Sequence, residues 1–361
     1  MIDMSLSEIL NVLYLFSFVV FLGYGQRIQT FMALLSVRGK LAQLGSFRNA
    51  AHKRLLDLIV QHGMNQIDAT SVIDRLTRSF VITPANLDPA GIVGKLEHVL
   101  DTYDENLKGE VHRLVPGAKD VEVNNLTNLL EVSIGQDNMF RIVRHYYLQS
   151  KKPGGLLALA QLQMNLPMIM EEAEAYNSAV DAFAIGKPIG DGAGPLVARR
   201  FSKGSSAREV VRDTNVYEST FEGRKLLVVR AKGPGGNVGK PRLAVEKLVK
   251  EGGPIRLIVT VDAALKLEGE ESGEVAEGVG AAIGGPGTER YHVEEAATRH
   301  EIPLEAVVVK MSSKQAISTM SPDIEKSIEE AERLVGTIIA TETRPGDTVI
   351  VAGIGNAVGI E

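Results

Sequence analysis

The sequence predicts a membrane-anchored protein with an all-helical middle region and a C-terminal α/β domain built on a mostly parallel sheet. Three observations support this. Residues 9–25 form a charge-free apolar run, apolar residues between 31 and 183 recur at helical spacing, and strand-like and helix-like segments alternate from Gly186 onward. The predicted domains are therefore a transmembrane anchor (1–30), a helical domain (31–183) and an α/β domain (184–361).

Composition excludes several classes of protein. A net charge of −6 over 361 residues, with no block of Lys and Arg, gives no reason to expect nucleic-acid binding. The absence of cysteine excludes disulfides, a thiol nucleophile, iron–sulfur clusters and thiolate zinc sites.

Residues 9–25 predict the anchor. Only Asn11 and Ser17 are clearly polar in this run, which approaches the roughly 20 residues of a membrane-spanning helix. Acids precede the run and Arg27 and further basic residues follow it, so we expect a single-pass protein of the cell membrane with its bulk in the cytoplasm. The alternative is that residues 9–25 form a buried core helix or an oligomerisation helix. In the second case the protein is an oligomer.

The helical region is expected to contain six or seven helices, with breaks where proline and glycine cluster, as at Pro116-Gly117 and Lys152-Pro153. Asp88-Pro89 has the features of an N-cap followed by a first-turn proline, so a helix is expected to begin there. This region is the expected binding surface for a protein partner.

The α/β region has four apolar strand-like segments, at residues 225–230, 254–264, 304–310 and 347–353. Asp262 lies near the end of the second. Ligand sites of open parallel sheets lie beyond the carboxyl ends of the strands, which makes Asp262 a candidate site residue. The alternative is that Asp262 only caps the following turn.

Two glycine-rich loops flank predicted helices. The loop at 186–194 presents one acid, Asp191, before a helix, where glycines allow close approach of the backbone to a ligand. The loop at 233–240 contains Lys240 but departs from a phosphate-binding P-loop at Pro234 and Pro241, so an anion on its amides remains an alternative while ATP or GTP hydrolysis is not expected.

Asp191, Asp262 and His292 together form a candidate constellation. Two carboxylates and an imidazole are donors that suit a divalent transition metal with open coordination positions. Their spacing does not by itself identify a metal site.

The segment Ile189-Gly-Asp-Gly-Ala-Gly-Pro-Leu-Val-Ala198 resembles a motif of the hydrogenase-maturation endopeptidases, in which the acid before the second glycine contacts a metal. Residues 257–263 are similar to the second acid-bearing strand of that family, and His292 lies about as far beyond Asp262 as their histidine ligand. Residues 262–309 also resemble the spore germination protease, whose catalytic acids need no metal.

The order of the motifs differs from those families. Their Gly-Ile-Gly-Asn strand directly precedes the acidic glycine loop, whereas here Gly353-Ile-Gly-Asn356 lies at the far end of the chain. The resemblance therefore implies a circular permutation, with strand 348–352 inside the sheet and its turn beside Asp191. The predicted ligand-binding positions are Gly190, Gly192, Gly194, Lys240, Gly353, Gly355 and Asn356. The whole chain also resembles an archaeal family with no assigned function.

The leading hypothesis is a cytoplasm-facing, peptidase-like hydrolase. Asp191 and Asp262 would hold or activate the attacking water, and His292 would bind the metal or carry a proton. The alternative is a non-enzymatic scaffold or sensor that binds a small anionic ligand or a protein partner.

Overall fold

The computed structural model describes residues 6–82, 91–251, 253–285 and 287–361. The chain divides into two compact units. The first comprises Met1–Asn49 and Gln136–Ala173, and the second comprises Ala50–Gly135 and Glu174–Glu361.

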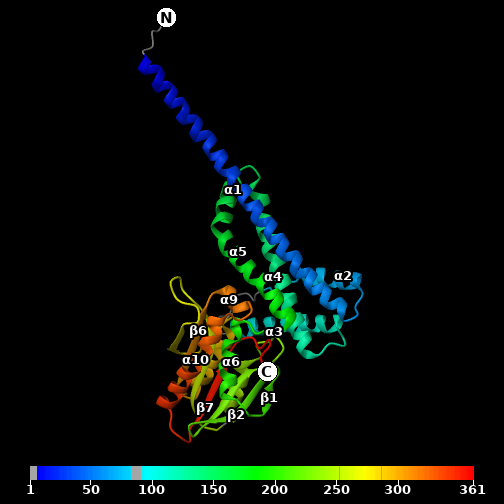
Figure 1. Ribbon diagram of the computed structural model, residues 1–361, viewed down its shortest axis with the longest axis vertical. Coiled ribbons are helices and arrows are strands. Elements are labelled where there is room, and N and C mark those ends of the chain that lie inside the picture. Colours follow the sequence, from blue (N-terminus) through cyan, green and yellow to red (C-terminus); the bar gives the residue numbers. More distant parts are fainter. Residues whose placement is uncertain (1–5, 83–90, 252, 286) are drawn as a thin grey trace. The chain divides into compact units, whose positions relative to one another are not determined.

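The N-terminal apolar run lies in α1 (Leu6–Gln61), one continuous helix of 56 residues (Figure 1). Within the ranges just given, no helix is long and apolar enough to cross a membrane, so the predicted anchor and the single-pass cytoplasm-facing location in the cell membrane are wrong. The charge-free run would rise only about 26 Å as a helix, against a hydrocarbon core of roughly 30 Å. It also contains Asn11 and Ser17, and the same helix continues through Arg27.

The first unit is helical in its described part except for the turn at residues 151–155. It takes in most of α1, the second half of α4 (Asp120–Ser150) and most of α5 (Leu156–Ile185). Leu44, Val143 and Leu159 are fully or almost fully buried in it. Gln136 donates a 2.7 Å hydrogen bond from Nε2 to the carbonyl of Ala173, which ties α4 to α5.

The second unit begins with a helical part. The end of α1, α2 (Gln66–Leu76), α3 (Ile92–Leu114), the start of α4 and the end of α5 share one apolar core. The predicted breaks at Pro116-Gly117 and Lys152-Pro153 fall between helices, and the described residues before Ile185 form five helices rather than six or seven. The helix start predicted at Asp88-Pro89 lies outside the described residues.

The rest of the second unit is an α/β domain on a seven-stranded sheet of order β1-β2-β3-β7-β4-β6-β5. The strands are β1 (Ala207–Val211), β2 (Thr214–Phe221), β3 (Arg224–Ala231), β4 (Ile255–Leu265), β5 (Val275–Val279), β6 (Leu304–Met311) and β7 (Thr348–Gly353). All four predicted strands are present, as the parallel set β3-β7-β4-β6.

The sheet is mixed, so the prediction of a mostly parallel sheet is wrong. β1 and β2 form an antiparallel hairpin on β3, and β5 pairs antiparallel with β6. These strands lack the long apolar run that marks a strand buried on both faces, which is why the sequence pattern did not reveal them. Asp213 and Glu222 take positive φ angles at the turns beside β2.

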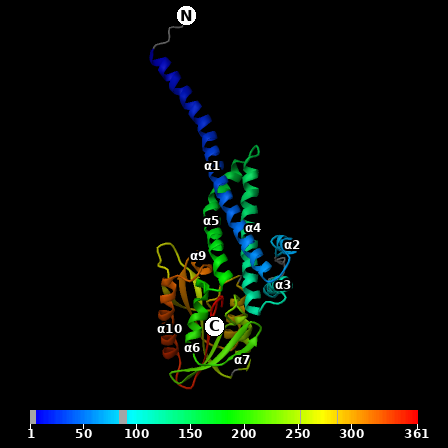
Figure 2. The ribbon, with the colours of Figure 1, turned by 45° about the vertical axis from the view of Figure 1, so that its right-hand side comes forward.

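Helices cover both faces of the sheet. The helices α6 (Ala193–Phe201) and α10 (Pro322–Glu342) pack on one face, whose strand residues include Val349 and Val351. The helices α7 (Pro241–Glu251) and α8 (Thr288–Arg299) pack on the other, which includes Ile350 and Ala352 (Figures 1 and 2). This cover explains the unbroken apolar sequence of β7.

Candidate functional site

The last strand lies in the interior of the sheet, as the permuted arrangement requires. β7 is parallel to both neighbours, and Ala352 pairs with Val229 of β3 and Thr260 of β4 (Figure 1). The turn after β7 therefore emerges at the carboxyl ends of the parallel strands, where ligand sites of α/β sheets lie.

That turn meets the first glycine-rich loop. The N–H of Asn356 donates a 2.8 Å hydrogen bond to Oδ2 of Asp191. A Cβ added to Gly355 would collide with the carbonyl oxygen of Asp191, and Gly355 has a φ of 128°. Only glycine fits this crossing, because an L side chain would meet both a steric clash and an unfavourable backbone conformation.

A second glycine crossing holds the start of α6 against the sheet. A Cβ at Gly194 would collide with the carbonyl oxygens of Ile354 and Val261, and a Cβ at Gly353 would collide with the carbonyl of Gly194. Asp191 lies in the short 3-10 turn Gly190–Gly192 that leads into α6. The glycines thus set Asp191 at a helix N-terminus directly beyond the ends of β4 and β7.

Asp262 lies near the carboxyl end of β4 and is 4% exposed. Its Oδ1 accepts a 2.7 Å hydrogen bond from the N–H of Ala263, and its Oδ2 accepts one of 2.8 Å from Gly284. Gly284 lies in the segment between β5 and the helix at Thr288–Arg299, so the acid bonds to a distant part of the chain. Asp262 therefore does not act only as a local turn cap.

Asp191 perturbs Asp262, and we call the two residues the Asp pair. Burial raises the pKa of Asp191, and the hydrogen bond from Asn356 offsets this only in part. Burial, together with repulsion from Asp191, raises the pKa of Asp262 to about 8 despite its two N–H donors. Among the described residues, no Lys, Arg or His forms an ion pair with either carboxyl group. With a pKa of about 8, Asp262 is mostly protonated at neutral pH.

His292 does not join the Asp pair. It lies on α8 with Nε2 3.4 Å from Glu97 of α3, and Nδ1 3.6 Å from Glu246 and 3.7 Å from Glu295. Arg242 of α7 contacts Glu97, Glu246 and Glu289 in the same place. We call these six residues the Arg242 cluster.

The predicted metal site of Asp191, Asp262 and His292 is therefore wrong. Over the part of the chain that the structure describes, no group of three or more His, Asp or Glu side chains is arranged to hold a metal ion.

The comparisons with known proteins identify a family. Residues 11–186 match a family model described as the N-terminal domain of a protein of unknown function (DUF1512), and residues 189–361 match the C-terminal domain of unknown function of DUF1512. The chain belongs to the DUF1512 family. The comparison with curated proteins gave no match.

In this DUF1512 chain the second glycine-rich loop, residues 233–240, is bonded to other parts of the same chain. The N–H of Gly236 donates to Oδ1 of Asn125 at 2.7 Å, and that of Lys240 donates to Oγ1 of Thr214 at 2.6 Å. The Lys240 ammonium forms an ion pair with Asp101 of α3. The groups that an anion would need are therefore already bonded, which weakens the case for an anion at Lys240.

A recess of about 250 Å³ lies between this loop and the helices α3 and α4, and Asn356 lines it. Its cations are matched by acids: Lys240 with Asp101, Lys108 with Asp213 and Arg212 with Glu105.

Two further acids of the recess, Asp104 and Glu131, form no ion pair among the described residues. Burial, followed by repulsion from Asp104, raises the pKa of Glu131 to about 7. Burial also raises the pKa of Asp104, the neighbouring Lys240 opposing it. Sequence analysis missed both residues, because an acid within an amphipathic helix is normally solvated. The recess is thus a polar space with an excess of acid, and Asn356 links it to Asp191.

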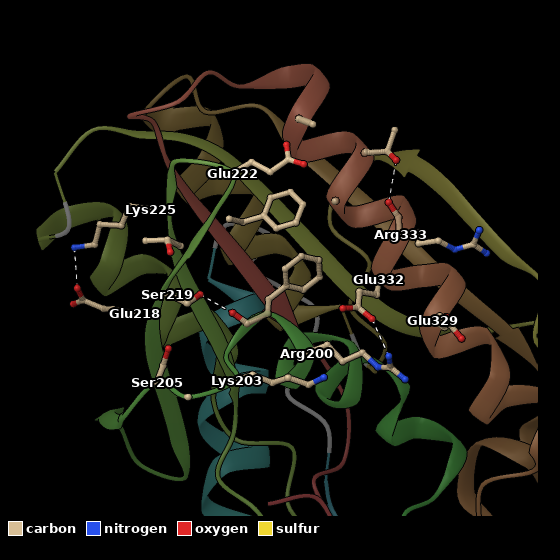
Figure 3. A pocket seen from close by; sticks show the side chains of 17 residues that line it. Arg200, Lys203, Ser205, Glu218, Ser219, Glu222, Lys225, Glu329, Glu332 and Arg333 are labelled. Atoms are coloured by element: carbon tan, nitrogen blue, oxygen red, sulfur yellow. Dashed lines mark hydrogen bonds and ion pairs between the residues drawn. The ribbon is translucent and has the colours of Figure 1, made fainter.

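A wider cavity, of about 1250 Å³, lies between β2, the end of α6 and α10 (Figure 3). Two ion pairs lie within the cavity: Arg200 pairs with Glu332 at 2.9 Å, and Lys225 pairs with Glu218 at 2.9 Å. A wide surface hollow of this kind indicates function less strongly than the buried Asp pair.

Proposed function

We propose that the α/β domain of this DUF1512 chain is a metal-independent hydrolase that cleaves peptide bonds with the Asp pair. One observation carries the proposal: two buried carboxyl groups without a cation lie at the carboxyl end of a parallel sheet, and Asp191 is near enough to Asp262 for its repulsion to help raise the pKa of Asp262. Burying an unmatched acid pair lowers stability, so such a pair is more typical of catalysis than of structure.

The roles follow from the protonation states. The Asp191 carboxylate takes a proton from water, whose oxygen attacks the carbonyl carbon of the scissile bond. The Asp262 carboxylic acid donates its proton to the amide nitrogen, so the C–N bond breaks and an acid and an amine leave. The recess lined by Asn356 and Glu131 supports the approach of a polar peptide from the side of α4.

The resemblance to the endopeptidases also supports the proposal, through the position of β7. A permuted chain places the Gly353-Ile-Gly-Asn356 turn beside Asp191, and that neighbourhood is present here. The alternative of a scaffold or sensor with an anion on the second glycine loop has less support, because that loop is bonded within the chain. A protein partner of the helical region and an archaeal source stay predictions.

A peptide-library assay tests the proposal. The purified chain is incubated with a proteome-derived peptide library, and new termini are identified by mass spectrometry. We expect cleavage that a chelator does not affect, that Asp191→Asn and Asp262→Asn each abolish, and that the exposed acid variant Glu325→Gln retains. No cleavage by the wild type, or cleavage that survives both Asp substitutions, contradicts the proposal.

A further inference from the structure

A second polar site lies on the other side of β7 from β4, at Arg230 of β3. Its strand pairs place Arg230 between Asn215 of β2 and Gly353 of β7, deep in the sheet. Arg230 is only 4% exposed, and its side chain lies on the face covered by α6 and α10, where Leu226 and Val228 of the same strand belong to the apolar core. A cation in this position is unusual, because arginine is almost never fully buried unless it is paired.

Arg230 has no acidic partner among the described residues. Its guanidinium lies over the ring of Tyr217, with Cζ 4.6 Å from the ring centroid. Nε and Nη1 are buried without a hydrogen-bond partner. Burial is the main cause that lowers the pKa of Arg230. Repulsion from Arg199 also lowers it, and the interaction with Tyr217 acts in the opposite direction. The surrounding protein therefore leaves the charge of Arg230 without a counterion.

A cavity of about 550 Å³ opens onto Arg230. Tyr217 forms part of its wall, and the last turn of α6 and the turn after it contribute Arg199, Ser202 and Lys203. Neither Arg199 nor Lys203 forms an ion pair with any residue that the structure describes. The volume is that of a small-molecule pocket.

The simplest alternative explains Arg199 and Lys203 but not Arg230. Cations near the last turn of a helix complement the partial negative charge of its end, which accounts for the basic residues of α6. Arg230 is on a central strand and gains nothing from that helix end. The acids of the cavity, Glu325 and Glu361, are exposed, so solvent screens their charges and they do not neutralise the buried guanidinium.

We infer that this cavity, the Arg230 pocket, binds a phosphate group, with Arg230 as the buried anchor and Arg199 and Lys203 as outer contacts. The planar guanidinium fork matches a tetrahedral oxyanion, and three cations without acidic partners match a dianion better than a monoanion such as a carboxylate. The phosphate comes either free or as part of a small phosphate monoester. The site is distinct from the Asp pair, because neither Asp191 nor Asp262 lines the cavity.

Thermal unfolding and calorimetry of the full chain test this inference. The probes are inorganic phosphate and glycerol 3-phosphate, with chloride at matched ionic strength and acetate as the monoanion. We expect a dose-dependent rise in Tm with phosphate or with the ester, and little with chloride or acetate. Tighter binding of the ester indicates a phosphorylated metabolite, and equal or tighter binding of inorganic phosphate indicates the free ion.

Three variants locate the site. Arg230→Met is expected to abolish the phosphate response and to fold without loss of Tm, because it removes an unmatched buried charge. Arg199→Gln is expected to weaken binding about tenfold, the effect of one charge-assisted contact. Arg208→Gln, an exposed cation on β1 outside the cavity, is expected to change nothing and serves as the matched control.

Absence of any phosphate or ester response above chloride in the wild type overturns the inference, as does an undiminished response in Arg230→Met. If Arg230→Met does not fold, Arg199→Gln decides alone: unchanged affinity overturns the inference, and weakened affinity with an unaffected Arg208→Gln supports it. Peptide cleavage by the Asp pair is measured in parallel, so failure of one proposal is distinguished from failure of the other.

Discussion

The Asp pair and the Arg242 cluster show two opposite ways of burying ionisable groups in one unit. In the Arg242 cluster a 5% exposed arginine faces three glutamates that come from three different helices. In the Asp pair, two buried acids have no cation, and the hydrogen bonds they receive come from backbone N–H groups alone. The first arrangement joins helices, whereas the second leaves two acids without a counterion, which we propose serves catalysis. The sequence pattern had joined His292 to the wrong partner group.

We expect the largest change in the free energy of unfolding when Arg242, the cation of the Arg242 cluster, is removed. Arg242→Met leaves Glu97, Glu246 and Glu289 without a cation, and breaking a buried ion pair in this way costs about 3 to 5 kcal/mol. Urea unfolding measures the loss. Arg299→Gln is the control, because its pair with Glu295 is exposed and contributes less than about 1 kcal/mol. Equal effects of the two substitutions would mean that the cluster does not hold α3, α7 and α8 together.

The second effect tests the backbone crossing that positions the Asp pair. Gly194→Ala forces a methyl group against the carbonyls of Ile354 and Val261, and backbone atoms cannot yield as a side-chain tip can. We expect a loss of about 3 kcal/mol in the free energy of unfolding, with loss of peptide cleavage. Gly278→Ala is the matched control, since nothing lies within 4 Å of its added Cβ. A stable, active Gly194→Ala variant would contradict the close approach.

The pH dependence of stability tests the protonation of the pair. The pKa of Asp262 is about 8 in the folded chain and near 3.8 in the unfolded chain, so a raised value means that stability is full below about pH 4 and is lost as pH rises to about 8. In the wild type this loss of stability is about 1 kcal/mol per pH unit at its steepest. We expect Asp262→Asn to remove it.

Unfolding by urea at several pH values between 4 and 9 measures the effect. The slope of stability against pH is a better readout than the stability at one pH. The substitution also changes the absolute stability, because the asparagine amide cannot accept hydrogen bonds from both Ala263 and Gly284. In Asp191→Asn the repulsion on Asp262 is gone, so the loss of stability should end at a lower pH and be smaller in total. A wild-type slope that neither substitution changes would contradict the coupled pair.

The parts of this architecture that depend on local pattern were predictable. The four apolar strands follow from burial on both faces, and the proximity of the Gly353-Ile-Gly-Asn356 turn to Asp191 follows from the resemblance of the motifs together with a circular permutation. The hairpin of β1 and β2 was not predictable from that rule, because an antiparallel edge has polar residues on one face.

The partners of charged side chains were also not predictable. His292 lies thirty residues beyond Asp262 in the sequence, yet α8 directs it toward Glu97 of α3, an element 190 residues earlier in the chain. One local feature of the sequence did indicate such a partner, at the end of β3. The segment Lys225-Leu-Leu-Val-Val-Arg230 ends a buried strand on a cation, which indicates either a buried acidic partner or a bound ligand.

The smallest predicted effect is that of His292→Gln, and it distinguishes the Arg242 cluster from the Asp pair. His292→Gln keeps a side chain of similar length with a hydrogen-bond donor, and Arg242 still neutralises the glutamates around it. Because the His292 side chain is 21% exposed and its contacts are 3.4 Å or longer, we expect a change in stability below about 1 kcal/mol. Peptide cleavage should keep its wild-type rate and its indifference to a chelator. If His292→Gln instead abolishes cleavage while the chain stays folded, His292 acts with the Asp pair in solution, and the division of the second unit into a structural cluster and a catalytic pair is wrong.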